Sequence, residues 1–362
     1  MAVYELKQTR PAPENLKGPI HWIKENLFST PADIIVTLLI LFFLIQVIPP
    51  FLDWAFLNAS FGGSVKADAI GTGANWIFIK EKFSMFMYGF YPSSEIYRLK
   101  ILVFVTFIII GLFKYVAKTT PQRIFVFLLY PVIGFILIKG GFFGLVEVET
   151  SKWGGLLLTL VISFVGISLS IPFGIILAFG RQSQLPIIKN ISVVYIEFIR
   201  GVPLITMLFM GSVLLPLFFQ EGVEVNKLLR ALIVITMVES AFVSEAIRGG
   251  LQAIPKGQYE SADSLGLSYW QKMILVILPQ ALKVAIPNLV GISIELFKDT
   301  SLVMIIGLFD LLSMVHLTAN DSHWLGMETE GYVFVTVIYL IFCYSMSRYS
   351  MTLEKRFNTD HR

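Results

Sequence analysis

Long apolar runs separated by short polar connectors dominate this sequence. A helix that crosses the ~30 Å hydrocarbon core of a bilayer needs about 20 mainly apolar residues. Runs near that length lie at 33–51, 100–115, 124–138, 155–179, 191–219, 227–247, 282–311 and 333–351, the seventh being interrupted at 298–299. The pattern therefore predicts an all-α polytopic membrane protein with eight spans.

The connectors suggest how the chain is divided. A polar segment precedes the first run, which Pro49 and Pro50 are expected to end because proline lacks the helical N–H donor. The connector at about 52–97 contains an amphipathic stretch, 77–89, which is either an interfacial helix or a plain loop. Polar residues return before residue 153. We expect the segments 1–32, 33–150, 151–354 and 355–362.

Composition supports a membrane protein and argues against several other classes. Of the 362 residues, 56% are hydrophobic and 15% are charged, whereas soluble domains are ~25% charged. The single cysteine, Cys343, permits no intrachain disulfide. The four histidines are scattered without metal-ligand spacing. The sequence thus predicts neither a metal site nor catalytic residues.

Lysine and arginine are unevenly distributed among the connectors. The rich connectors carry Lys7, Arg10, Lys17 and Lys24, then Lys114, Lys118 and Arg123, then Arg181 and Lys189, then Arg248, Lys256, Lys272 and Lys283, and finally Arg348, Lys355, Arg356 and Arg362. The alternate connectors hold fewer. Because cytoplasmic loops are enriched in basic residues, we expect both termini and the connector around 250–283 to be cytoplasmic.

A polar stretch at 254–279 stands between the sixth and seventh runs. Pro255 and the residues after it predict a short helix over 257–264, and Gly266 is suited to the left-handed position that ends it. Ser268 is a candidate N-cap for a second short helix, which Pro279 is expected to end. Spaced three apart, Tyr259, Ala262 and Leu265 are expected to share one face. Such a helical hairpin either joins two spans or docks another protein.

The spacing within this stretch resembles a known signature. Glu260-Ser261-Ala262, then Gly266, Val276 and Leu278-Pro279 are similar to the loop of membrane subunits of bacterial ABC importers, with Ser261 and Val276 as departures from its Glu-Ala-Ala and Ile. The resemblance implies that 250–283 is a coupling loop that docks on a separate ATPase. The chain has no Gly-x-x-x-x-Gly-Lys-Ser/Thr phosphate loop, so ATP and Mg are expected on that partner.

Two groups of charged residues lie toward the cytoplasmic ends of the fifth and sixth runs. Glu197 and Arg200 are followed by Gly201 and Pro203, which are expected to break helical regularity. The Glu–Arg pair is either intrahelical or, as in similar amino-acid importer permeases, part of the inner pathway. Spaced three apart, Glu245 and Arg248 predict a structural ion pair on one helix face.

Charged residues also lie deeper in the apolar runs, where each costs ~2.5–3.5 kcal/mol on insertion scales. Glu239, next to Ser240, has no adjacent basic residue and could bind a substrate ammonium or a partner permease. The segment 298–301 offers both signs of charge. We expect it to be a broken helix near the substrate or a structural turn, and its residues are Lys298, Asp299, Thr300 and Ser301.

Taken together, the chain resembles a permease subunit of the type I amino-acid ABC importers, in the His/Glu/Gln/Arg/opine-type polar amino acid family. Three spans before a five-span core, and the tail at 347–357, are most similar to the second permease of the general L-amino-acid systems. The resemblance implies a bacterial inner-membrane heterodimer with a related permease, two ATPase subunits and a periplasmic substrate-binding protein. It also implies import of L-amino acids by alternating access. The alternative is an ion-coupled secondary amino-acid transporter.

Overall fold

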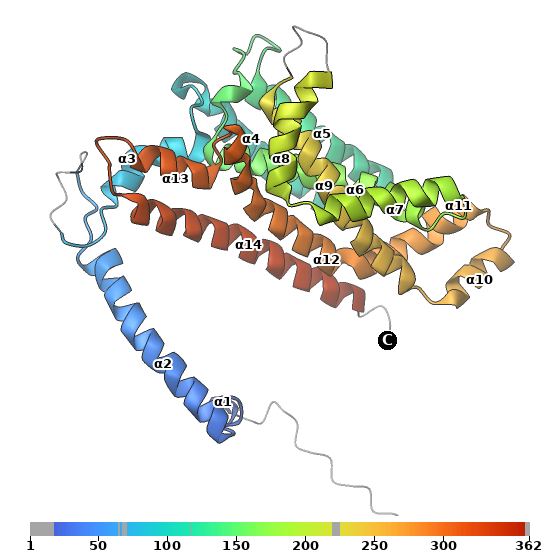
Figure 1. The fold of residues 1–362 in the computed structure, drawn as a ribbon, viewed down its shortest axis with the longest axis horizontal. Helices are drawn as coiled ribbons and strands as arrows, with labels where there is room; N and C mark the ends of the chain where they lie inside the picture. The colour runs from blue at the N-terminus through green and yellow to red at the C-terminus, as the bar shows by residue number, and fades with distance from the viewer. Residues whose placement is uncertain (1–17, 64–65, 67–70, 117, 219–224, 359–362) are drawn as a thin grey trace, which may run out of the picture. The chain divides into compact units, whose positions relative to one another are not determined.

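The computed structural model describes residues 18–63, 66, 71–116, 118–218 and 225–358 (Figure 1). The chain divides into two compact units, Met1–Ile77 and Phe78–Arg362. Within the described residues the elements are helices and a few isolated β-bridges, so the all-α expectation is confirmed. Parts of the predicted terminal segments, 1–17 and 359–362, lie outside the described residues, as does the expected end of the fifth span at Phe219.

The first unit contains α1 (Pro19–Leu27) and α2 (Pro31–Leu52), which continues as a π-helix, η2 (Asp53–Leu57). Thr30 and Asp33 form a capping box at the start of α2. The expectation that Pro49 and Pro50 end this helix is wrong. The backbone N–H of Asp53 donates to the carbonyls of both prolines, so the helix continues through them, and the π-helical segment begins after them at Asp53.

The second unit begins with a helix that packs against the start of α14 (Glu328–Asn358) and the connector before it. The amphipathic stretch 77–89 forms a helix, α3 (Ile77–Tyr88), rather than a plain loop, and its position in the membrane interface stays a prediction. Phe78 of α3 packs on Trp324, and Phe86 packs on Phe334. The ammonium of Lys82 donates a 2.7 Å hydrogen bond to Asp321. These contacts fix α3 against the connector that precedes the last helix.

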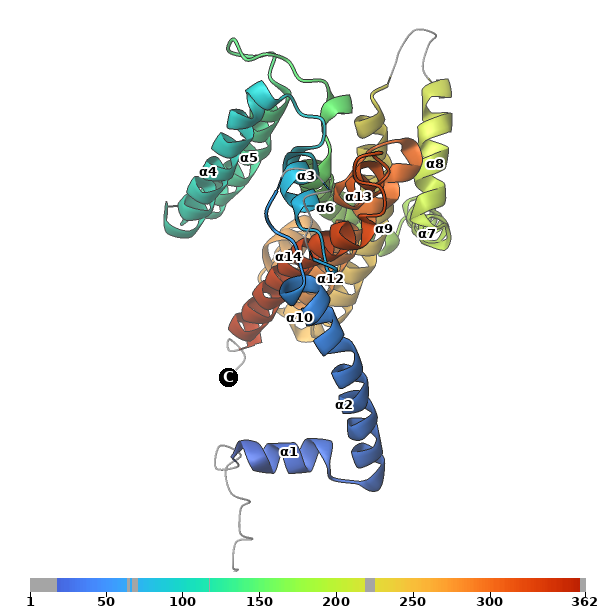
Figure 2. The same ribbon diagram turned by 90° about the vertical axis from the view of Figure 1, so that its left-hand side faces the viewer.

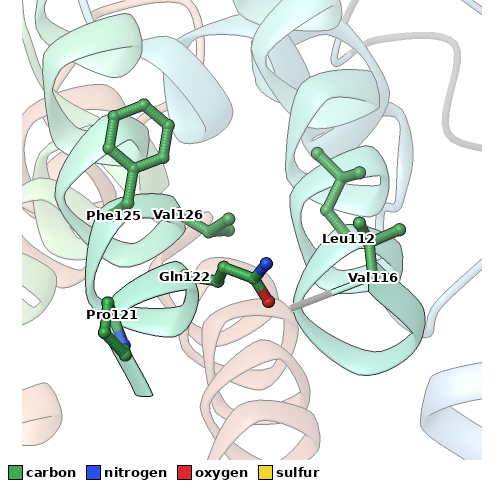
Figure 3. A pocket seen from close by; sticks show the side chains of 6 residues that line it. All are labelled: Leu112, Val116, Pro121, Gln122, Phe125 and Val126. Carbon is green, nitrogen blue, oxygen red and sulfur yellow. The ribbon is translucent and has the colours of Figure 1, made fainter. Parts of the chain in front are cut away.

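A helix pair follows α3. It consists of η4 (Ser93–Glu95), α4 (Ile96–Gly111), the π-helix η5 (Leu112–Val116) and α5 (Thr120–Lys139), with α4 and α5 side by side (Figure 2). Between their ends lies an apolar cavity of about 360 Å³, into which Figure 3 shows Leu112, Gln122 and Val126 projecting. The Gln122 carboxamide oxygen accepts from the backbone N–H groups of Lys118 and Thr119. Gln122, the polar side chain in this cavity, therefore serves to cap the start of α5.

The remaining helices form the main core of the unit. They are α6 (Gly155–Arg181), α7 (Pro186–Gly201), α8 (Leu204–Leu214), η7 (Leu215–Phe218), α9 (Lys227–Gln252), α10 (Lys256–Ser264), α11 (Tyr269–Gln271), η8 (Lys272–Ile277), α12 (Leu278–Asp299), η9 (Thr300–Ile306), α13 (Leu311–Ala319) and α14 (Glu328–Asn358). Helix α9 is central, because it packs against α6, α7, α8 and α12 (Figure 1).

Small residues let these helices approach closely. A Cβ added at Gly174 on α6 would stand 2.4 Å from a Val243 methyl on α9. A Cβ at Gly250 would stand 2.3 Å from the carbonyl oxygen of Ala281 on α12. Gly174 in the predicted fourth run and Gly250, just after the predicted sixth run, thus have a packing role.

Asp310 holds the connector after η9 in place from a fully buried position. Its carboxylate accepts from the backbone N–H groups of Leu312 and Ser313, and from the Tyr339 hydroxyl on α14. The N–H of Leu311 donates to the Thr159 hydroxyl on α6. Asp310 therefore joins the start of α13 to α14, and the adjacent backbone N–H of Leu311 joins it to α6.

Two predicted spans differ from the structure. The fifth is not one helix, because Val202 and Pro203 are extended and α7 and α8 bend by 107° between them. The seventh is not interrupted at 298–299. Helix α12 includes both residues, a 3₁₀ segment continues to Ile306, and the break comes at left-handed Gly307.

Six helical segments of the described chain are long and apolar enough to cross a membrane, or seven if the bent pair α7 and α8–η7 is one span. They are Pro31–Leu57, Ser93–Val116, Pro121–Lys139, Gly155–Arg181, Tyr269–Ile306 and Glu328–Arg356. The sixth predicted span corresponds to α9, whose 26 residues include five charged ones. Its crossing of the membrane stays a prediction.

Candidate functional site

The loop at 254–279 has most of the predicted local structure. The first helix is α10, and Gly266 follows it with φ +72°, as its left-handed assignment requires. Ser268 and Gln271 form a capping box that starts α11. The expectation that Pro279 ends the second helix is wrong. Pro279 lies at the start of α12, directly after the π-helix η8, where its missing N–H is tolerated.

One face of this loop is anchored in the core. Ala262 is buried, and Tyr259 packs against a cluster that contains Met273 and Ile277 together with residues of α6, α9 and α12. The Tyr259 hydroxyl donates to the carbonyl of Leu251 at the end of α9. Movement of α10 is thereby linked mechanically to α9 and α12.

The opposite face of the loop is open. Glu260, Ser261 and Gly266 are exposed, and Leu265 is 79% exposed although it was expected to share the face of Ala262. Leu265 follows the last residue of α10, where the chain turns toward Gly266 and carries the side chain outward. Of the other predicted coupling residues, Val276 is half-buried and Pro279 is exposed. An exposed apolar side chain beside a carboxylate is a surface that another protein can contact.

Five charged residues form a network at the end of the core that holds the loop. The predicted pair of Glu197 with Arg200 is not formed; Glu197 instead lies 2.9 Å from Arg181 of α6. Arg200 is 3.7 Å from Glu245, and the predicted pair of Glu245 with Arg248 is present at 2.7 Å.

Glu245 is the centre of this network. Its carboxylate also forms an ion pair with Arg181 at 3.1 Å, so this one acid contacts arginines on α6, α7 and α9. The sequence did not predict the ion pairs of Arg181, which stands there as one of the basic residues of a connector. Its position two residues after an apolar run, where a long cationic side chain reaches toward the membrane surface, was the available signal.

Glu239 is buried on α9, with 4% of its surface exposed. The ionisable groups that act on it electrostatically are Asp299 and Glu295, which are both acidic. Ser240 beside it donates to the carbonyl of Met237 and lies 3.4 Å from the Tyr195 hydroxyl. Glu239 therefore forms no ion pair among the described residues, and the acids facing it make a cation the ligand that would suit this place.

The segment 298–301 is more regular than expected. Thr300 is fully buried and its hydroxyl donates to the carbonyl of Phe297, while the Ser301 hydroxyl donates to the carbonyl of Lys298. Both hydroxyls are thus used within their own helix rather than offered to a ligand. Lys298 is exposed and Asp299 is half-buried, so of this segment the Asp299 carboxylate is the group brought near Glu239.

Comparison with known proteins gives relatives that are all membrane components of transport systems. Residues 170–359 match the family described as the inner membrane component of binding-protein-dependent transport systems. The chain is 52% identical to the inner membrane amino-acid ABC transporter permease protein YhdY of Escherichia coli K12, over 97% of this chain and 96% of that protein.

Two further relatives differ in length. The chain is 39% identical to the glutamate/glutamine/aspartate/asparagine transport system permease protein BztC of Rhodobacter capsulatus, over 99% of this chain and 98% of that protein. It is 35% identical to the probable glutamine ABC transporter permease protein GlnP of Bacillus subtilis, over 56% of this chain and 92% of that protein. The shorter relative matches only about half of the present chain.

Proposed function

The chain belongs to the inner membrane components of binding-protein-dependent transport systems and is a multi-pass permease subunit of an amino-acid ABC importer, and we propose that α10 couples it to a separate ATPase. A subunit of this kind is not itself an enzyme. The observation that carries the proposal is the two-sided geometry of α10. Ala262 fixes one side in the core, and Leu265 and Glu260 project from it.

This geometry suits the transmission of force. The segment from α11 through η9 is helical from Tyr269 to Ile306, so the loop is joined to a membrane-spanning element without a flexible break. The 2.5 Å hydrogen bond from Lys272 to Asp263 ties α10 to that segment as well. Closure of ATPase subunits on ATP would thus displace α10 and α12 together, and the pathway would alternate between its two openings.

The proposed topology has eight spans with both termini and α10 in the cytoplasm. Counting α9 as a span is supported by its packing, since α6, α7, α8 and α12 pack against it and Glu239, the charged residue in the middle of the helix, is buried. The excess of lysine and arginine in the connector at 250–283 supports the orientation. ATP and Mg are expected on the ATPase subunits, of which there would be two, together with a related permease and a periplasmic substrate-binding protein.

The proposed substrates are L-amino acids with varied side chains, as the name of the Rhodobacter relative indicates for that protein. Every such substrate carries an α-ammonium group. Glu239 faces acids rather than bases, so it is the group we assign to that ammonium, with Asp299 and Ser240 beside it. Lys298, Thr300 and Ser301 support the helix end, and Gly201 and Pro203 supply the bend between α7 and α8.

The coupling role is tested with Glu260→Arg in the assembled transporter. We expect the ATPase to co-purify poorly and binding-protein-dependent amino-acid uptake into proteoliposomes to fall at least tenfold, because an exposed docking residue changes the sign of its charge. Glu354→Arg, the same change at an exposed residue near the end of α14, is the matched control. Normal assembly and uptake with Glu260→Arg, or uptake driven by an ion gradient without the ATPase, would reject the proposal.

A further inference from the structure

A second cavity lies where α5 ends and α9 begins, away from α10 and from Glu239. Its volume is about 570 Å³, which falls within the ~300–1,000 Å³ of small-molecule sites. The walls come from α5, the connector 140–154, α6 and α9. The cavity thus lies between the first helix pair of this unit and the core, and the proposed transport pathway does not use it.

The cavity has a polar end and an apolar end. The polar side chains are Lys139, Glu147, Glu149, Thr150, Ser151 and Asn226, which all lie at helix ends or in the connector. The apolar side chains come from within the helices and include Phe135, Val161, Val165 and Leu232. Lys139 is the last residue of a helix long enough to span the membrane. The polar end is therefore at headgroup level, and the apolar end is at the depth of the acyl chains.

The charges of the polar end are only partly satisfied. Lys139 lies 3.5 Å from Glu147, a loose contact in which the side chains are 36% and 60% exposed. Glu149 accepts a hydrogen bond from Ser151 and forms no ion pair among the described residues. The end therefore presents one cation and two carboxylates, with room for both a phosphate and an ammonium.

Trp153, which also lines the cavity, carries a buried hydrogen-bond donor that is not used. Trp153 is 5% exposed, and its indole N–H has no hydrogen-bond partner in the described part of the chain. A buried donor without a partner costs about 1–3 kcal/mol. An ester or phosphate oxygen of a bound amphiphile, after a small rotation of the indole, would supply the missing acceptor.

We propose that this cavity binds one phospholipid with a zwitterionic headgroup that carries a primary ammonium, as in phosphatidylethanolamine. The phosphate lies near Lys139, the ammonium pairs with Glu149, and one acyl chain extends along Val161 and Val165 between α5 and α6. An anionic phospholipid fits less well, because two carboxylates would face its headgroup. The bound lipid fills the space between the first helix pair and the core.

Native mass spectrometry of the intact transporter complex tests this site. The complex is stripped with detergent and then offered an equimolar mixture of phosphatidylethanolamine and phosphatidylglycerol. We expect one retained lipid, with about fivefold preference for phosphatidylethanolamine, the factor that a partly exposed ion pair contributes. Glu149→Gln should remove most of this preference. Glu328→Gln, at an exposed residue outside the cavity, should leave it unchanged.

Filling the apolar end gives a second test. Val165→Trp should abolish retention, whereas Leu169→Trp, one turn along α6 and outside the cavity, should retain the lipid. Equal retention by Val165→Trp and the wild type, preference for phosphatidylglycerol, or a retained molecule that is not a phospholipid would overturn the proposal. If Val165→Trp does not assemble, Glu149→Gln decides the question, because this change leaves the apolar wall intact.

Discussion

Removing the charge of Glu245 should destabilise the core more than any other single neutralisation in its network. The network holds three arginines and two glutamates, so Glu245→Gln raises its net charge from +1 to +2 while preserving the side-chain volume. Glu245 is 15% exposed, and its partners lie at 2.7, 3.1 and 3.7 Å. The arginines would then repel one another across α6, α7 and α9.

The magnitude follows from burial. Removing one partner of a fully buried ion pair costs ~3–5 kcal/mol, and exposed pairs contribute ~0.2–1 kcal/mol. The arginine side chains here are 23–38% exposed, so solvent screening brings the expected loss for Glu245→Gln to about 2–3 kcal/mol. Thermal unfolding of the purified complex in detergent measures this loss as a lower midpoint.

Glu197→Gln is the matched control. Glu197 contacts only Arg181 within this network and is 58% exposed, so the expected loss is at most about 1 kcal/mol. The double variant Glu245→Gln with Arg181→Gln should recover part of the stability, since it removes one of the uncompensated cations. Equal midpoints for Glu245→Gln and Glu197→Gln would refute the assignment of Glu245 as the centre of the network.

Three further outcomes are expected. Gly250→Ala should destabilise the complex by about 1–3 kcal/mol, because its Cβ would press on a backbone carbonyl of α12, whereas Gly249→Ala, with open space around it, should not; equal thermal midpoints would contradict this. The hydrogen bond from Lys82, together with the backbone N–H of His323, lowers the pKa of Asp321, so the stabilisation is present above about pH 4 and is lost as the pH falls through the lowered pKa; Lys82→Met should weaken this acid dependence, and an unchanged pH profile of thermal stability would reject the pair. Glu239→Gln should weaken uptake of all amino acids while the complex still assembles, and unchanged uptake by the assembled variant would remove Glu239 from the substrate site.

Local patterns determined much of this protein. Apolar runs of bilayer length identify a polytopic helical protein, because no soluble fold of this size hides so much apolar surface. Gly266 and Ser268 were assigned correctly in the coupling loop because caps depend on backbone angles and contacts within a few residues. The expected ends at Pro49 and Pro279 failed because α2 continues through Pro49 into the π-helix η2, and because Pro279 lies in the first turn of α12, directly after the π-helix η8, where its missing N–H is tolerated.

Only the tertiary structure decided which charges meet. From the sequence, the nearest partner of Glu245 is Arg248, three residues along the same helix, and that pair is present. The contacts with Arg181 and Arg200 arise because α6 and α7 pack on α9, and the pairing of Glu197 with Arg181 follows from the same packing. Apolar periodicity specifies that a helix is buried or faces lipid, but it does not specify its rotation or its neighbours. The partners of a membrane charge therefore depend on close packing at small residues such as Gly174 and Gly250, which only the folded chain reveals.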